Sequence, residues 1–153
     1  MNKKLIAALT LAVASLSAIA ADPAKPEGMI EIRQSGYTFM AWNMGKIKAN
    51  LSGTYNKDQV LAAAKTIAAI ANSGMGALYA PGTEKSVGGR KTHVKPELFA
   101  EMPEVGKLAK ALATDSIELE RVAATGDVAA IKAQFGKVGE DCKACHDKYK
   151  MKD

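Results

Sequence analysis

Apolar positions recur every three or four residues in four separate segments of the chain, and strand-like alternation is confined to short ambiguous runs. A three-four repeat places apolar side chains along one face of a helix. The pattern therefore predicts an all-α chain. The expected helices span residues 27–51, 57–75 and 103–125, and a fourth helix follows Asp127 and carries its apolar stripe to Tyr149.

The expected helix ends carry residues typical of caps. Asn56 can cap the second helix, with Gln59 three residues later as in a capping box. Gly74 and Gly76 favour an end to that helix near residue 75. Asp127 precedes the last helix as an N-cap candidate. Each of these residue types is common at the boundary where it occurs here, so local chemistry and periodicity agree.

Residues 77–102 interrupt the helical pattern and form one long connection. The stretch contains Pro81-Gly82 and Gly88-Gly89, with a short helical turn expected at residues 96–100. Long connections in compact domains are often functional. Two short connections and one long one most simply give an antiparallel up-down-up-down four-helix bundle, in which the first and last helices are antiparallel neighbours.

The apolar seams of the first and last helices each contain residues that do not fit a purely structural role. In the first seam the exception is Arg33, because a cation that faces a core usually needs a partner. In the last seam the exceptions are two cysteines. The first seam comprises Ile30, Arg33, Tyr37, Met40, Met44, Ile47 and Leu51, and the last comprises Val128, Ile131, Phe135, Val138, Cys142, Cys145 and Tyr149.

Residues 1–20 have the composition of a secretory signal peptide. A basic start at Lys3 and Lys4 precedes an apolar run, and Ala18-Ile19-Ala20 matches a small-x-small cleavage site. We expect cleavage near Ala20 and export to the periplasm. Residues 21–153 have the size of a single domain. They contain no run of about 20 apolar residues, so no membrane span is expected.

The charge balance argues against a nucleic-acid partner. The formal net charge of the whole chain is +5, and removal of the signal peptide would take away two lysines. Basic and acidic residues are spread along the sequence, and no basic run is interleaved with aromatic residues.

The sequence Cys142-Lys-Ala-Cys145-His146 is the pattern of c-type haem attachment. On a helix, the two cysteines and the histidine project toward one side, so two thioether bonds and an iron ligand can converge. A redox-active disulfide is an alternative, but such sites usually lie where a strand enters a helix. A structural zinc ion would need about four ligands, and His93 is the only other histidine.

The heights of residues along the bundle axis indicate which side chains lie across the iron from His146. In an antiparallel pair, the end of the last helix and the start of the first share a level, so Arg33 and Tyr37 should lie near the haem. We expect Tyr37 over the haem face opposite His146. Arg33 should contact a propionate, or alternatively reach solvent. Met40, Met75 and His93 are the alternative sixth ligands or, more simply, packing and surface residues.

Together the signal peptide, the four helices, "IRQSGYTFMAWNM" in the first and "CKACHDKYK" near the C-terminus resemble cytochrome c′, the class II c-type cytochromes. The resemblance covers essentially all of residues 21–153. It implies one covalently bound haem c per chain, held in the bundle core by Cys142 and Cys145. It further implies a pentacoordinate, mainly high-spin iron ligated by His146, with Tyr37 packed on the distal face.

The resemblance also implies roles for residues around the haem edge. Arg33 and Gln34 match the pair that contacts haem edges and propionates in the family, and Thr83 and Glu84 match loop residues that approach the haem. Lys150 matches a basic residue beside the proximal pocket, where the family commonly has arginine. Lysine keeps the charge but lacks the planar fork of arginine.

Family members usually form homodimers through the first two helices, and a strip of Ile32, Phe39 and Trp42 on the first helix is compatible with that. The strip could instead cover the long loop. The expected function is electron transfer with an unidentified periplasmic redox partner. The alternative is binding of NO or CO at the open iron. A peroxidase-like enzyme is disfavoured because Tyr37 is a poor acid-base group.

Overall fold

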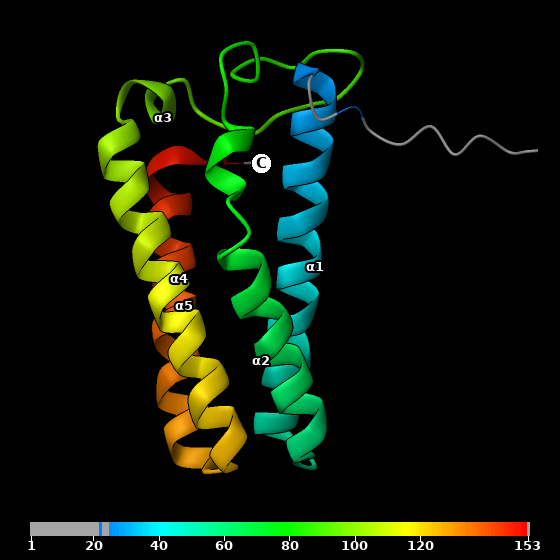
Figure 1. The fold of residues 1–153 in the computed structure, drawn as a ribbon, viewed down its shortest axis with the longest axis vertical. Coiled ribbons are helices and arrows are strands. Elements are labelled where there is room, and N and C mark those ends of the chain that lie inside the picture. Colours follow the sequence, from blue (N-terminus) through cyan, green and yellow to red (C-terminus); the bar gives the residue numbers. More distant parts are fainter. Residues whose placement is uncertain (1–21, 23–24, 153) are drawn as a thin grey trace, which may run out of the picture.

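The computed structural model describes Asp22 and residues 25–152, and the expected signal peptide lies outside these residues. Within them the chain forms helices and no strand, which confirms the all-α prediction (Figure 1). The elements are α1 (Pro26–Ser52), α2 (Lys57–Ala71), the 3-10 helix η1 (Met75–Leu78), α3 (Glu97–Ala100), α4 (Met102–Thr125) and α5 (Val128–Tyr149).

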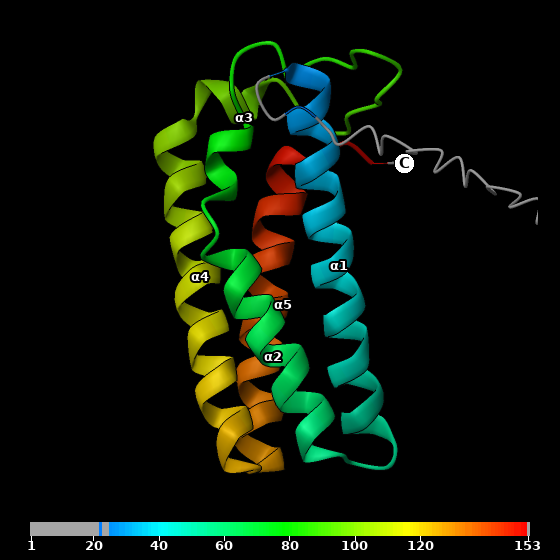
Figure 2. The same ribbon diagram turned by 45° about the vertical axis from the view of Figure 1, so that its right-hand side comes forward.

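The four long helices form the expected antiparallel bundle. Helix α1 packs on α2, α2 on α4 and α4 on α5 along much of their lengths. The start of α1, the end of α5, η1 and the long loop gather at one end of the bundle (Figures 1 and 2). That end therefore carries the residues for which the sequence predicts chemistry.

The N-terminal ends of α2 and α5 have the side-chain caps that the sequence predicts. The Asn56 side chain accepts a hydrogen bond from the Gln59 N–H at 3.0 Å, and Asp127 Oδ1 accepts from Ala129 and Ala130 at 3.0 and 3.1 Å. These two caps are confirmed.

Helix α2 ends at Ala71 rather than near residue 75. The Asn72 N–H donates to Ala68 O at 3.1 Å, and the Ser73 hydroxyl donates to Ile70 O at 2.7 Å. These bonds satisfy carbonyl groups of the last turn. Gly74 then takes a left-handed φ of 81°, which a glycine adopts without strain. The chain thus stops α2 and starts η1 in a new direction.

The core divides into two clusters. The larger one contains Met40, Ile47, Ile67, Leu119 and Ile131 and joins the four long helices. A smaller cluster of Leu98, Val105 and Tyr149 lies where α3, α4 and the end of α5 meet, with Tyr79, Phe99 and Cys145 packed against it.

One member of the predicted stripe of α5 lies outside the core. Val128 is 42% exposed because it is the first residue of that helix.

The end of α5 is tied to the long loop. The Lys95 N–H donates to Tyr149 O at 2.8 Å, and the Met151 N–H donates to His93 O at 2.7 Å. The Tyr149 hydroxyl donates to Glu101 at 2.7 Å. These bonds fix the last turn of α5, and with it His146, against the loop.

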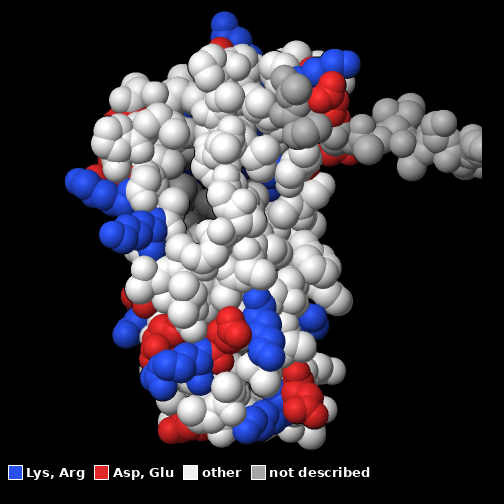
Figure 3. Space-filling view, viewed as in Figure 1, with Lys and Arg blue, Asp and Glu red and all other residues white. Residues whose placement is uncertain are grey.

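The surface shown in Figure 3 mixes basic and acidic side chains over the lower part of the bundle, and its middle, where α2 leads into η1, is largely uncharged. This face presents no extended area of one charge sign.

Among the described residues, no helix combines the length and the apolar character that crossing a membrane requires.

Candidate haem site

The last turns of α5 present two thiols and an imidazole. Cys142 and Cys145 are half-buried, and no disulfide joins them. Burial raises the pKa of both thiols, so they are protonated thiols at neutral pH. No group of three or more His, Cys, Asp or Glu side chains that could hold a metal ion occurs among the described residues. The geometry thus offers no support to the disulfide and zinc alternatives.

The imidazole of His146 is available as a ligand. Burial and the neighbouring Lys150 lower its pKa, while Asp147 acts in the opposite direction. A neutral imidazole is the form that binds a metal. No hydrogen bond joins this side chain to another described residue. Both nitrogen atoms are therefore uncommitted within the described part of the chain.

Tyr37 of α1 lies opposite the CKACH turns. Burial raises its pKa, and the nearby thiols of Cys145 and Cys142 act in the same direction. This proximity agrees with the expected level of Tyr37 in the bundle. A phenol whose pKa is raised is a weaker proton donor than free tyrosine, so Tyr37 is a poor acid-base group.

A second tyrosine, Tyr79, joins Tyr37 at this site. The two phenol groups lie close enough to influence each other's pKa, and burial raises the pKa of Tyr79 as well. Tyr79 directly follows η1 and packs against the same smaller core cluster as Cys145. Sequence reasoning missed it because a loop residue has no helical period. Its one sequence signal is an aromatic residue just before the Pro81-Gly82 turn.

Arg33 is buried in the bundle end and is only 2% exposed. The alternative in which it reaches solvent is therefore wrong. Its guanidinium donates to Leu78 O at 3.1 Å, Thr83 Oγ1 at 2.9 Å, Thr83 O at 2.9 Å and Thr92 Oγ1 at 2.8 Å. It also lies 4.6 Å from the centroid of the Tyr79 ring. Arg33 thus joins α1 to both ends of the 78–92 segment.

Other predicted edge residues surround this arginine. Gln34 Nε2 donates to Lys91 O at 2.6 Å, and Thr83 is fully buried. The Glu84 carboxylate accepts from the Gly82 N–H at 2.7 Å. The structure thus brings Arg33, Gln34, Thr83 and Glu84 to one end of the bundle.

Lys150 follows α5 directly and is exposed. Its charge is close enough to His146 to lower the pKa of the imidazole. Lys150 thus lies near His146, and its role beside the proximal pocket stays a prediction.

The three alternative ligands lie in different surroundings. Met40 is 3% exposed within the larger core cluster. Met75 packs on α1 at Gly36, where an added Cβ would lie 2.9 Å from the methionine Cε. His93 is an exposed loop residue. Tyr37, by contrast, lies close enough to both cysteines for their thiols to help raise its pKa.

The residues fit a covalently attached planar group. Helices α1 and α5 carry Tyr37 and the CKACH turns, yet they contact each other far less than the other neighbouring pairs do. The two thiols and the imidazole of the CKACH turns are the donor set that a haem c requires.

The bundle and its site together define a c-type haem protein of the four-helix-bundle class. The sequence model described as Cytochrome C' matches residues 28–150. The chain belongs to the cytochrome c′ family. This family carries covalently attached haem c, and the sequence contains two cysteines for the attachment.

Several relatives resemble the chain over nearly its whole length. Cytochrome c′ of Allochromatium vinosum is 60% identical over 144 residues, which cover 94% of this chain and 92% of the relative. The crystal structure of cytochrome c′ from Thermochromatium tepidum has a TM-score of 0.84 and 60% identity, covering 86% of this chain and 100% of that one. A cytochrome c′ with ligand-controlled dimer dissociation has a TM-score of 0.83 and 61% identity, covering 84% and 98%.

Proposed function

We propose that the chain is an exported, periplasmic monohaem cytochrome that transfers electrons, released from its signal peptide near Ala20. Cys142 and Cys145 form the thioether bonds, and His146 is the axial ligand of a pentacoordinate, high-spin iron. The observation that carries the proposal is that Tyr37, a weak ligand, lies close enough to Cys142 and Cys145 for the two thiols to help raise its pKa. Such a haem exchanges one electron and leaves one position open to a diatomic molecule.

The surrounding residues orient the cofactor in this proposal. Arg33 and Gln34 hold the haem edge and its propionates, together with Thr83 and Glu84 of the loop. Lys150 lies beside the proximal imidazole and, after burial, is the second cause that lowers its pKa. None of these residues supplies an acid-base pair at the open face, which supports a carrier or a gas-binding protein over an enzyme. The redox partner is a periplasmic protein whose identity the site does not specify.

Binding of NO or CO is the second candidate function. A relative from Alcaligenes xylosoxidans, 30% identical with a TM-score of 0.75, has been solved in its ferrous form as a variant with bound NO. Another variant of that protein has been solved with bound carbon monoxide. The crowded face under Tyr37 favours small neutral ligands, because a larger ligand would have to displace more of the packed side chains.

The Tyr37→Ala variant tests the open-face proposal. Moving a buried aromatic side chain aside costs on the order of 1.5 kcal/mol or more, so truncation should speed CO association at least about tenfold. The measurement is stopped-flow mixing of ferrous protein with CO and, separately, with NO. Unchanged association rates would remove Tyr37 from the distal face.

The ferric wild-type protein provides the accompanying spectroscopic test. A high-spin EPR signal is expected. A low-spin signal with a methionine-sulfur charge-transfer band would overturn the pentacoordinate site. Electron-transfer rates with periplasmic redox proteins, set beside the gas association rates, would rank the two candidate functions.

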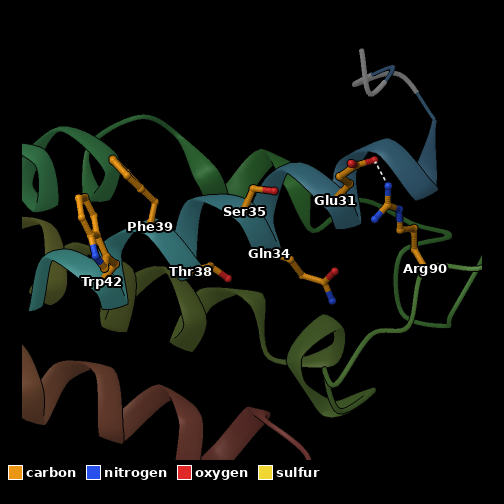
Figure 4. Close-up of a pocket in the computed structure, with 7 residues that line it drawn as sticks. All are labelled: Glu31, Gln34, Ser35, Thr38, Phe39, Trp42 and Arg90. Atoms are coloured by element: carbon orange, nitrogen blue, oxygen red, sulfur yellow. Dashed lines mark ion pairs between the residues drawn. The ribbon is translucent and has the colours of Figure 1, made fainter. Parts of the chain in front are cut away.

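We also propose that the chain forms a homodimer through α1 and α2. Phe39 and Trp42 are 49% and 57% exposed and stack at 5.3 Å. They border a groove of about 530 Å³ on α1, next to the ion pair between Glu31 and Arg90 (Figure 4). Exposed aromatic residues that adjoin polar groups are typical of protein interfaces.

Trp42→Glu should convert the dimer into a monomer, because a buried unpaired carboxylate disfavours association. Sedimentation velocity over a range of micromolar concentrations would measure this. Ile117→Glu is the matched control, since Ile117 is 53% exposed on α4 and lies outside the proposed interface. A dimer that survives Trp42→Glu, or a wild-type monomer, would contradict the proposal.

A further inference from the structure

We propose that Lys95 is a positioning residue that caps the C-terminal end of α5 and thereby fixes the orientation of His146 toward the iron. The inference rests on the proposed ligation of iron by His146, and it adds a residue outside α5 that controls this ligand. Lys95 lies two residues before α3. Helix α3 and the end of α5 lie at the same end of the bundle (Figure 1).

The last turn of α5 depends on donors from outside the helix. The final carbonyl groups of an α-helix have no partner within it, and in α5 these belong to residues 146–149. The His146 carbonyl accepts from the Lys150 N–H at 3.0 Å. The other three carbonyls each accept from Lys95. Its Nζ donates to Asp147 O at 3.4 Å and to Lys148 O at 3.1 Å, and its N–H donates to Tyr149 O at 2.8 Å.

The Lys95 side chain contributes charge as well as hydrogen bonds. A cation is favourable at a helix C-terminus, where the aligned peptide dipoles leave a partial negative charge. Hydrogen bonds from a charged donor are also stronger than those between neutral groups. Lys95 is half-buried, so water competes with its hydrogen bonds less than it does at a fully exposed lysine. The side chain therefore holds the last turn of α5 more firmly than backbone bonds alone would.

Lys95 can hold α5 because its own backbone is anchored to the core. Its carbonyl accepts from the Leu98 N–H at 3.1 Å, and Leu98 is 3% exposed in the smaller core cluster. The preceding residue, Val94, forms an isolated antiparallel bridge with Lys150 and packs against the same cluster. A shift of Lys95 away from α5 would therefore disturb contacts with the core in addition to the cap.

The cap acts on the ligand because of where His146 lies in α5. The proposed thioether bonds at Cys142 and Cys145 come just before it in the chain, whereas its own carbonyl belongs to the last turn. Opening of that turn would rotate the imidazole relative to the two thioether bonds. A closed turn keeps the imidazole in one orientation, so its bond to iron keeps one strength.

The test compares Lys95→Met with the wild-type holoprotein in two measurements. Methionine removes the charge and both hydrogen bonds of Nζ, while the backbone N–H remains. The amide hydrogen of Lys150, which is bonded to His146 O, should exchange about tenfold faster, the factor expected when a charged cap is lost from a helix end. In the resonance Raman spectrum of the ferrous protein, the iron–histidine stretching band should broaden and shift to lower frequency.

Lys95→Arg and Lys107→Met are the matched variants. Arginine keeps the charge and has enough donors for both carbonyls, so it should restore the wild-type band. Lys107 is an exposed residue of α4 whose Nζ pairs with Glu104 at 3.1 Å. Its replacement should leave the band and the exchange rate of the Lys150 amide unchanged. If Lys95→Met fails to fold, Lys95→Gln, which keeps a neutral donor, should shift the band in the same direction by a smaller amount.

The outcomes separate the inference from the proposed function. If the wild-type protein shows an iron–histidine band and Lys95→Met, or Lys95→Gln in its place, leaves that band unchanged, the inference is overturned and ligation by His146 survives. Faster amide exchange without a change in the band would assign Lys95 a purely structural role and overturn the inference as well. Equal changes in Lys95→Arg and Lys95→Met would also overturn it. If the ferrous wild-type protein lacks an iron–histidine band, the proposed function fails and the inference fails with it.

Discussion

Cys142→Ser combined with Cys145→Ser is expected to abolish covalent haem attachment completely. The thioether bond needs a sulfur atom, and a serine hydroxyl of similar size cannot replace it. The chain has two cysteines, so no other thiol can take over. A denaturing gel stained for haem should show no signal for the variant, and acid-acetone extraction should release whatever haem remains bound.

The single variants and one control make this result specific. Each single serine variant should retain one thioether bond and give a weaker haem signal. Cys145→Ser should weaken the signal more than Cys142→Ser does, because Cys145 packs against the smaller core cluster. Lys143→Ala, between the two cysteines, removes an exposed residue that pairs with Asp147 and should attach haem normally. A stained band in the double variant would disprove the attachment site.

The bundle could be predicted from sequence because its helices are long and regularly patterned. Periodicity located the four helices, and capping residues located most of their ends. The end of α2 was misplaced because Gly74 and Gly76 were taken as its end signal, whereas side chains at Asn72 and Ser73 close the helix earlier. Competition between two neighbouring end signals cannot be settled without knowing which hydrogen bonds form.

The site was predictable only where it lies on helices. CKACH, Arg33 and Tyr37 have fixed levels because helical rise and antiparallel packing determine them. Tyr79 and Thr92 lie in the long connection, where no period constrains the direction of a side chain. The sequence predicted that Arg33, facing the core, would need a partner. Only the folded chain shows that acceptor atoms in the loop meet this need. Its propionate contact stays a prediction.

Arg33→Met is expected to lower the free energy of unfolding of the holoprotein by about 3 kcal/mol. Methionine fills much of the same volume, but it leaves four acceptor atoms of the 78–92 segment without their donor. Hydrogen bonds from a charged donor are the stronger kind, and these bonds are largely shielded from water. The loss should appear as a fall of roughly 10 °C in the melting temperature followed by circular dichroism.

Two further variants distinguish the loss of this network from the loss of a positive charge. Arg33→Lys keeps the charge, yet one ammonium group cannot reach acceptors on both Leu78 and Thr92 with the geometry of a guanidinium, so most of the destabilisation should remain. Arg121→Met removes an exposed arginine paired with Glu118 and should change stability by less than about 0.5 kcal/mol. If Arg33→Met melted within a degree or two of the Arg121→Met control, the loop would not depend on Arg33. A large loss for Arg33→Met together with full retention in Arg33→Lys would assign the effect to charge alone.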